Sequence, residues 1–443
     1  MSIKLSDHFT YQKLIRFIFP SVIMMIFTSM YSIVDGFFIS NYAGKTAFAA
    51  SSLIYPLIGI LGALGFMMGT GGTAIVGKLL GEQKNKQANE AFSMLVCVTA
   101  IGGIAFAAVG LFFLGEIAVA FGAQGQMLTD SVLYGRLCLI GIPFFMLQFF
   151  FQSFFVTAEK PKLGLFITAL SGVTNMVFDW LFIAVFHWGL AGAAIATVMG
   201  QMVGGILPLF YFGVKNSSLL RFAKPVFSAK VLLKTCTNGS SELMSNIATS
   251  VLTILYNFQL MRLVGENGVA AYGILMYVSF VFSAIFLGYA VGCAPVISFH
   301  YGAKNEGELK NLFGKSLKLT AIGGIVLTAA AIALADVLCK MFVGYDARLE
   351  TLTAYGLRLF AWSFLFSGFN IFGSAFFTAL NNGAVSAGIS FLRTMVFGVA
   401  SVLLLPPVLG TDGVWLASVA AELLSALVTA VCFILLRKKY RYF

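Results

Sequence analysis

The stretch Thr99-Ala100-Ile101-Gly102-Gly103-Ile104 occurs a second time without change, as Thr320-Ala321-Ile322-Gly323-Gly324-Ile325. The offset is 221 residues, close to half of the 443-residue chain. Further identical residues keep this register: Gly44 and Gly265, Gly71 and Gly292, Gly81 and Gly302, Tyr134-Gly135 and Tyr355-Gly356, Thr157-Ala158 and Thr378-Ala379, and Gly192 and Gly413. Composition bias gives isolated matches rather than a series in one register, so the sequence predicts two equivalent halves.

The composition places both halves in a membrane. The chain is 59% hydrophobic and 10% charged, with a mean hydropathy of +0.94. Apolar runs of about twenty residues, the length that crosses a bilayer as a helix, recur from end to end. Their continuity argues against an outer-membrane barrel, whose strands are short and alternate. The sequence therefore predicts an all-α polytopic membrane protein.

Polar and Gly/Pro breaks divide the chain into twelve transmembrane helices. The predicted spans are 14–40, 47–77, 91–114, 130–157, 163–186, 189–213, 233–262, 268–299, 315–335, 351–379, 385–409 and 413–436. Six spans in each half make two parallel six-helix lobes, residues 1–213 and 233–443, which a basic linker at 214–232 joins. Transporters are often built from such repeats and bind their substrate between them.

The distribution of Lys and Arg gives an orientation. Twenty-one of the 28 fall on the face that carries both termini, six on the other, and Arg393 lies inside a span. The positive-inside rule then places both termini in the cytoplasm, with the protein in the cell inner (plasma) membrane.

Composition also excludes several classes of function. The net charge of +11 is spread over short loops, so it reports orientation and not nucleic-acid binding. The six cysteines form no CxxC pair, and the three histidines are isolated. The sequence predicts no disulfide framework, no metal site of Cys and His, no cofactor and no enzyme active site.

Two acids inside predicted spans are the strongest functional signal. Asp35 lies in the first span and Asp179 in the fifth. A carboxylate at bilayer depth costs about 3 kcal/mol or more, so an acid there suggests function. Asn175 lies one helical turn before Asp179 on the same face, and Thr197 of the sixth span lies at a similar depth. We expect these four residues to meet at one level in the first half.

The repeat shows that this cluster belongs to the first half. In the common register Asp35 corresponds to Tyr256, and Thr197 to Ser418. Asn175 and Asp179 correspond to Val396 and Ala400. The second half has its own polar residues within spans: Glu242, Asn257, Asn370, Arg393 and Glu422. Arg393 needs a partner, for which Glu422 is the candidate.

Several polar and aromatic residues are candidates for binding a substrate. Gln148 and Gln152 share a face at i and i+4, and with Tyr31 they could line a cavity for planar cations. The seven Phe residues around them, between 144 and 155, are expected mainly to face lipid. The full predicted substrate-binding set is Tyr31, Gln148, Gln152, Glu242, Tyr256, Asn257 and Asn370.

The order of several motifs resembles one family over nearly the whole chain. They are Tyr31-Ser32-Ile33-Val34-Asp35, Gly69-Thr70-Gly71-Gly72, Gly81-Glu82-Gln83-Lys84, Asn175 with Asp179, Gly192-Ala193-Ala194-Ile195-Ala196-Thr197, and Tyr301-Gly302-Ala303-Lys304-Asn305. This pattern is similar to the multidrug and toxic compound extrusion (MATE) family, and most to its DinF-like branch.

The resemblance implies a secondary antiporter for bulky, often cationic compounds, exchanged for protons or sodium ions. Asp35, Asn175, Asp179 and Thr197 match the family's cation-coupling positions in the first lobe. Glu242 matches an acidic position of another branch, but the acid which that branch carries in its tenth span is missing here. Protons are favoured over sodium, although these four side chains could supply sodium ligands.

We therefore predict export of amphipathic cationic drugs or toxins by alternating access. The alternative is a flippase for a lipid-linked oligosaccharide or related lipid, since such flippases share an even-numbered lobe architecture. They usually line the cleft with several cationic residues, whereas Arg393 is nearly alone here. The expected partners are small amphipathic molecules and membrane lipid, with the protein a monomer.

Overall fold

The structure is a computed structural model that describes residues 3–343 and 346–443. Across these residues the chain is helical, without a strand, as the sequence predicts. The first half contains α1 (Tyr11–Phe38), η1 (Ile39–Ala43), α2 (Lys45–Gly81), α3 (Asn85–Ala120), α4 (Gly125–Thr157), α5 (Pro161–Asp179), η2 (Trp180–Val185) and α6 (Gly189–Gly213). The second half begins with α7 (Ala229–Leu263), α8 (Glu266–Gly302), α9 (Glu306–Ala333) and α10 (Ala335–Val343). It continues with α11 (Ala347–Phe360), η3 (Ala361–Ser363), α12 (Phe364–Ala379), α13 (Gly383–Phe391), η4 (Leu392–Gly398), α14 (Val399–Leu404), α15 (Pro406–Leu409) and α16 (Thr411–Tyr440).

The helices form twelve columns. Eleven spans in the described part of the chain are long and apolar enough to cross a membrane. The remaining column is α7, which is 35 residues long but carries more polar side chains. In the second half, α11 with α12, and α13 with α14 and α15, each form one column in place of a single long helix, while α10 follows α9 and packs mainly on α11. The predicted twelve-helix fold is confirmed.

The repeat is visible in the helix boundaries. α2 and α8 are both 37 residues long, and they begin and end 221 residues apart. Each follows a glycine with positive φ, +95° at Gly44 and +81° at Gly265. A side chain would be strained in this conformation, so glycine at both positions permits the same sharp turn.

Several predicted spans were shorter than the helices. α3 begins at Asn85 instead of residue 91, and α9 begins at Glu306 instead of residue 315. The sequence spans were drawn where apolar runs begin, but polar residues such as Glu and Lys also favour helices. Asn305 caps α9, because its Oδ1 accepts a hydrogen bond from the Glu308 backbone N–H at 3.0 Å.

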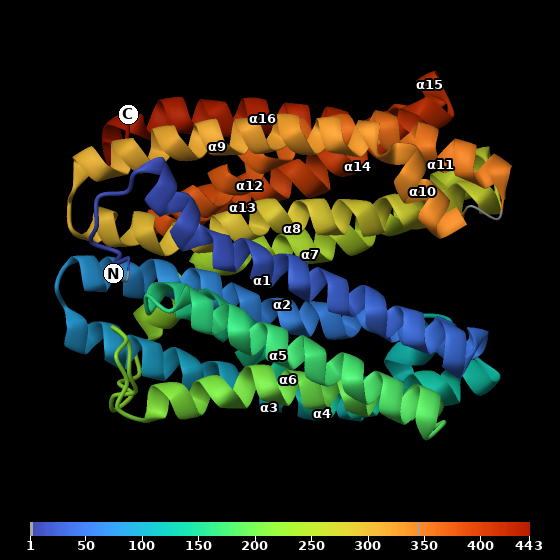
Figure 1. Cartoon of the computed structure of the whole chain (residues 1–443), viewed down its shortest axis with the longest axis horizontal. Coiled ribbons are helices and arrows are strands. Elements are labelled where there is room, and N and C mark those ends of the chain that lie inside the picture. Colours follow the sequence, from blue (N-terminus) through green and yellow to red (C-terminus); the bar gives the residue numbers. More distant parts are fainter. Residues whose placement is uncertain (1–2, 344–345) are drawn as a thin grey trace.

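The columns pack as two lobes (Figure 1), with α1 to α6 in one and α7 to α16 in the other. Both chain termini lie at the same end of the molecule, at the left in Figure 1, which we call the termini end. The lobes meet where α1 packs on α8 and where α2 packs on α7 and α8. Toward the opposite end the ribbons of the two lobes diverge.

The contact between α2 and α7–α8, which we call the seam, depends on glycines near the termini end. A Cβ at Gly71 would overlap the Thr235 carbonyl oxygen, and one at Gly239 would overlap the Met67 carbonyl oxygen. A Cβ at Gly302 would likewise overlap the Lys78 carbonyl oxygen. The two backbones therefore approach as closely as small residues in membrane helices allow.

Apolar packing follows the same division. One large cluster of buried residues, the shared core, joins both lobes at the termini end and includes Phe92 and Phe150 from the first and Phe313 and Phe376 from the second. Two further clusters each lie within one lobe, nearer the opposite end. The described residues thus hold the lobes together mainly at the termini end.

Candidate functional site

The four predicted coupling residues lie on three neighbouring helices of the first lobe. Asp35 is near the end of α1, Asp179 is the last residue of α5, and Thr197 is on α6. The Thr197 hydroxyl donates a hydrogen bond to Asp35 Oδ1 at 3.4 Å. The carboxyl groups of Asp35 and Asp179 lie close enough to interact with each other, and Asn175 interacts with Asp179. The structure therefore brings all four together.

The centre of this cluster is sealed from the surface. Asp179 is 0% exposed and Asn175 is 2% exposed. Neither carboxyl forms an ion pair with Lys, Arg or His in the described part of the chain. Although Asn175 lies near Asp179, its amide and the Asp179 oxygens have no hydrogen bond of good geometry among the residues that the structure describes. A buried carboxylate in this state is costly, and binding a proton or a cation would offset that cost.

π-helical turns follow both acids. η1 begins four residues after Asp35, and η2 begins directly after Asp179. Such turns are rare and often occur at functional sites, because the wider turn re-aims side chains and leaves backbone groups less regularly bonded. These π-helical turns were not predicted, because no sequence pattern in these stretches indicates a π turn.

Close helix packing positions the cluster. A Cβ at Gly200 of α6 would lie 3.0 Å from the Asn175 Cβ, and one at Gly172 of α5 would lie 3.3 Å from the Tyr31 ring. The two glycines therefore allow α5 to lie against both α6 and α1. This packing places Asp35, Asp179 and Thr197 at one level.

The two glutamines predicted to bind substrate, Gln148 and Gln152, lie on α4 and are packed inside the first lobe. Gln148 Nε2 donates to Ser171 Oγ at 3.2 Å, and Ser171 Oγ donates to the Gly200 carbonyl oxygen at 2.7 Å. Gln152 Nε2 donates to Thr28 Oγ1 at 3.4 Å. The side chain of Tyr31 hydrogen-bonds with Gln148. These groups connect α4 with α1, α5 and α6, and the glutamines are buried at 3% and 2% exposure.

The aromatic run of α4 does not face lipid as expected. Phe150, Phe151, Phe154 and Phe155 are at most 2% exposed and belong to the shared core. Phe150 stacks on Phe154 with ring centroids 4.3 Å apart. The prediction was wrong because lipid and protein interior are equally apolar, so composition cannot distinguish them.

The second lobe contains a different polar network. Arg393, within the π-helical turn η4, donates from Nε and Nη2 to Glu422 Oε1 at 2.9 and 2.5 Å. Asn370 Nδ2 donates to Glu422 Oε2 at 2.6 Å. The predicted partnership of Arg393 with Glu422 is confirmed. Glu242 on α7 lies near enough to Arg393 to interact electrostatically.

Tyr256 and Asn257 lie on α7 in the same lobe. The Tyr256 hydroxyl forms a 2.6 Å hydrogen bond with Ser418 Oγ, and its ring stacks on Tyr272 at 4.6 Å. Asn257 is half-buried. The substrate-binding candidates therefore fall into two groups, one in each lobe.

Side chains that could bind a metal ion are dispersed among the described residues. No cluster of three or more His, Cys, Asp and Glu side chains occurs in the described parts of the chain. The six cysteines are all free. Four oxygen-bearing side chains do lie at one place, those of Asp35, Asp179, Asn175 and Thr197. Oxygen ligands suit hard cations such as sodium better than they suit soft transition metals.

Comparison with known proteins was made for the whole chain. The MatE family model matches it twice, over residues 20–181 and 243–404, once in each half. The chain is 22% identical over 435 residues to the multidrug export protein MepA of Staphylococcus saprophyticus, covering 97% of this chain and 94% of MepA.

Solved structures share the fold. A MATE protein crystallised in complex with MaL6 aligns with a TM-score of 0.92 at 20% identity, covering 97% of both chains. An outward-facing multidrug resistance MATE family transporter of the MOP superfamily aligns with a TM-score of 0.91 at 21% identity, covering 97% and 96%. At this identity the likeness establishes the twelve-helix, two-lobe architecture.

Proposed function

The chain belongs to the MatE family of transporters, and from this premise we propose that it is a secondary antiporter exporting amphipathic organic cations in exchange for protons. The name of its relative MepA, a multidrug export protein, supports small and chemically varied substrates. The proposal includes a monomer in the plasma membrane, with both termini in the cytoplasm by the positive-inside rule. It involves no cofactor and no covalent chemistry.

The observation that carries the proposal is the carboxyl pair formed by the half-buried Asp35 and the buried Asp179. Two carboxylates in a low-dielectric interior repel each other, so they favour binding of a proton or another cation. Once protonated, the pair holds a cationic substrate less strongly, because the attracting charge is gone. A substrate and a proton that compete in this way are exchanged, as an antiporter requires.

The packing of the lobes supports alternating access. Because the shared core and the seam join the lobes at the termini end, protons and substrate would enter or leave from the opposite end in this conformation. With the termini in the cytoplasm, that end faces outward. A rocking of the lobes would then open the cytoplasmic side.

Transport measurements in cells and vesicles test the proposal. An efflux-deficient bacterial host that expresses the protein should retain less of a cationic dye and tolerate cationic toxins better. We expect Asp35→Asn and Asp179→Asn each to reduce efflux at least tenfold, since each removes one carboxylate of the pair. Tyr256→Phe, at the duplicate position of Asp35, removes only the hydroxyl that hydrogen-bonds with Ser418 and should have a milder effect.

The coupling ion is tested in proteoliposomes. We expect a pH gradient to drive substrate movement and a sodium gradient without a pH gradient to leave it unchanged. Movement driven by sodium alone would assign the four oxygen-bearing side chains to sodium. Full transport by either Asn variant would refute the coupling role, and no effect on any cationic compound would favour the lipid flippase.

A further inference from the structure

The non-helical residues before α1, numbers 3–10, cross the termini end of the molecule and contact both lobes. We call this segment the strap. On the side of the first lobe, the Leu5 backbone N–H donates to Glu159 Oε1 at 2.6 Å. Glu159 lies in the short turn between α4 and α5. The strap is thus fixed to the first lobe before α1 begins.

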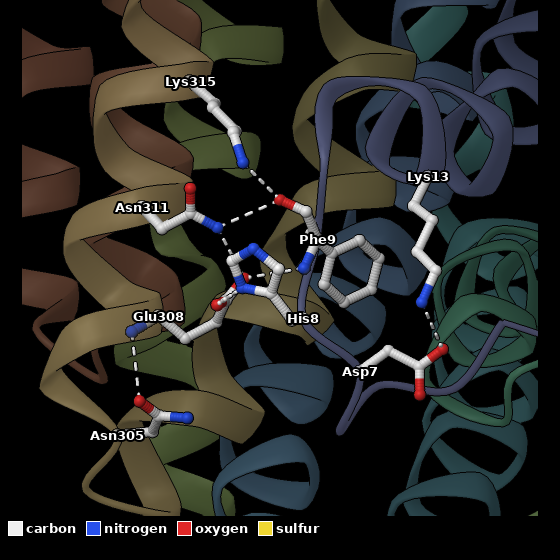
Figure 2. A network of polar contacts seen from close by, with 8 residues as sticks. All are labelled: Asp7, His8, Phe9, Lys13, Asn305, Glu308, Asn311 and Lys315. Atoms are coloured by element: carbon white, nitrogen blue, oxygen red, sulfur yellow. Dashed lines mark hydrogen bonds and ion pairs between the residues drawn. The ribbon is translucent and has the colours of Figure 1, made fainter.

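On the side of the second lobe the strap binds the start of α9 (Figure 2). The Phe9 backbone N–H donates to Glu308 Oε1 at 2.9 Å, and His8 Nδ1 lies 2.6 Å from Glu308 Oε2. The Phe9 carbonyl oxygen accepts hydrogen bonds from Asn311 Nδ2 at 3.0 Å and Lys315 Nζ at 2.5 Å. Glu308 is therefore the centre of the contact, and it is only 6% exposed.

Apolar side chains reinforce these polar anchors. Leu5 and Phe9 are both 0% exposed and belong to the shared core. The Phe9 ring meets the Phe17 ring of α1 edge to face, with centroids 5.8 Å apart. Hydrogen bonds to a charged group that is largely buried are among the stronger ones in proteins. The strap is therefore a built contact between the lobes.

We propose that the strap is a latch that holds the lobes together at the termini end and restrains their opening there. The inference rests on the alternating access of the proposed function, because opening at that end must separate α2 from α7 and α8. The strap continues into α1 of the first lobe, while Glu308 belongs to the second. Separation of the lobes at this end therefore has to break the contact at Glu308, and the contact of Leu5 with Glu159 holds the strap in position for it.

A native cysteine reports the opening of the seam directly. Cys236 on α7 places its thiol 4.0 Å from the Met68 sulfur of α2, across the seam. Alkylation of Cys236 should therefore speed up when the lobes part. The full-length protein in lipid nanodiscs would be treated with N-ethylmaleimide, and modification of each cysteine followed by mass spectrometry. Cys97, on the outer face of α3 within its predicted span, is reached by the membrane-permeant reagent whether or not the seam opens, so it is the internal reference.

Glu308→Gln is the first variant. It removes the charge that the strap binds, so we expect Cys236 to react about tenfold faster relative to Cys97. Glu306→Gln is the matched control on the same helix turn. Glu306 pairs with Arg441 on the exposed surface at 2.9 Å and does not contact the strap, so its loss should leave the Cys236 rate unchanged.

A double variant distinguishes a latch from two local defects. Glu159→Gln loosens the other end of the same strap and should also speed up alkylation of Cys236. Because Glu159 acts only by positioning the strap at Glu308, the double variant Glu159→Gln/Glu308→Gln should react no faster than Glu308→Gln alone. Independent local effects would instead multiply, and that result would overturn the proposal.

The latch can be tested even if Glu308→Gln does not fold, and the test does not depend on the efflux assay. If Glu308→Gln does not fold, His8→Ala removes one Glu308 contact at a ring that is largely exposed, and it should accelerate the reaction less. An unchanged Cys236 rate in folded Glu308→Gln or His8→Ala protein would refute the latch. Alkylation is measured without substrate, so a failure of the latch is separate from a failure of the efflux assay.

Discussion

At the scale of single residues, one contact is made twice. Thr197 hydrogen-bonds Asp35 in the first lobe at 3.4 Å, and Ser418 hydrogen-bonds Tyr256 at the duplicate positions in the second at 2.6 Å. The two lobes therefore share a hydrogen bond to a hydroxyl at this place, whereas the carboxylate at this position is found in the first lobe alone. The charge of Asp35 is the additional element, which agrees with a functional role.

Some residue partners could be predicted and others could not. Arg393 and Glu422 could be paired from sequence, because a charge inside a span requires an opposite charge. The hydrogen bonds of Gln148 and Gln152 could not, since the helical wheel gives the shared face but not the neighbour of that face. The structure places both glutamines between helices of one lobe.

The Arg393–Glu422 pair has a predictable effect on stability. Glu422→Leu leaves the half-buried Arg393 without its ion-pair partner and should lower the unfolding free energy by about 1.5–3 kcal/mol, the contribution of hydrogen bonds to a charged group. The double variant Arg393→Met/Glu422→Leu should recover most of this loss, because no unpaired charge remains. Thermal unfolding of the purified protein in detergent measures both. A Glu422→Leu protein as stable as the parent would show that the ion pair between Arg393 and Glu422 does not stabilise the fold.

At the scale of elements, apolar length predicted the helices, but packing decided their ends and faces. The polar starts of α3 and α9 were missed because they extend beyond the apolar run. The π turns after Asp35 and Asp179 depend on how α1, α5 and α6 fit together, which a single sequence does not encode locally. The burial of the α4 phenylalanines likewise depends on the neighbouring helices.

The seam gives a prediction for α2. Alanine at Gly71 would place its Cβ against the Thr235 carbonyl oxygen, so α2 and α7 must move apart at a cost of about 1–3 kcal/mol. We expect Gly71→Ala to accelerate alkylation of Cys236 and to reduce efflux severalfold. Gly59→Ala is the control on the same helix, because a Cβ there meets nothing within 4 Å. Equal behaviour of the two variants would show that the close approach at Gly71 is unimportant.

At the scale of the whole molecule, the repeat determined most of what could be predicted. The 221-residue offset predicts two six-helix lobes, and the equal bounds of α2 and α8 agree with it. The family model also matches once in each half. Which end of the molecule is closed could not be predicted, because it depends on backbone contacts at glycines such as Gly71 and Gly239.

The orientation of the molecule can be tested with fusions. We expect alkaline phosphatase to be active when fused after Gly44, in the turn between α1 and α2, and inactive when fused after Glu82. A fluorescent protein at the C-terminus should be fluorescent, since that end is predicted to be cytoplasmic. The reverse pattern would invert the topology and place the seam on the outer side.

The polarity of α7 has a consequence for how the protein is made. Each charged residue near the middle of a span opposes insertion by about 2.5–3.5 kcal/mol, and Glu242 lies well inside α7. This helix packs against α2, which the ribosome has synthesised earlier, and against α13, which follows later. Until α8 and α13 emerge, the packed neighbour of the nascent α7 is α2 of the first lobe. The two halves are duplicates in architecture, yet we expect the second to be assembled on the first during translation.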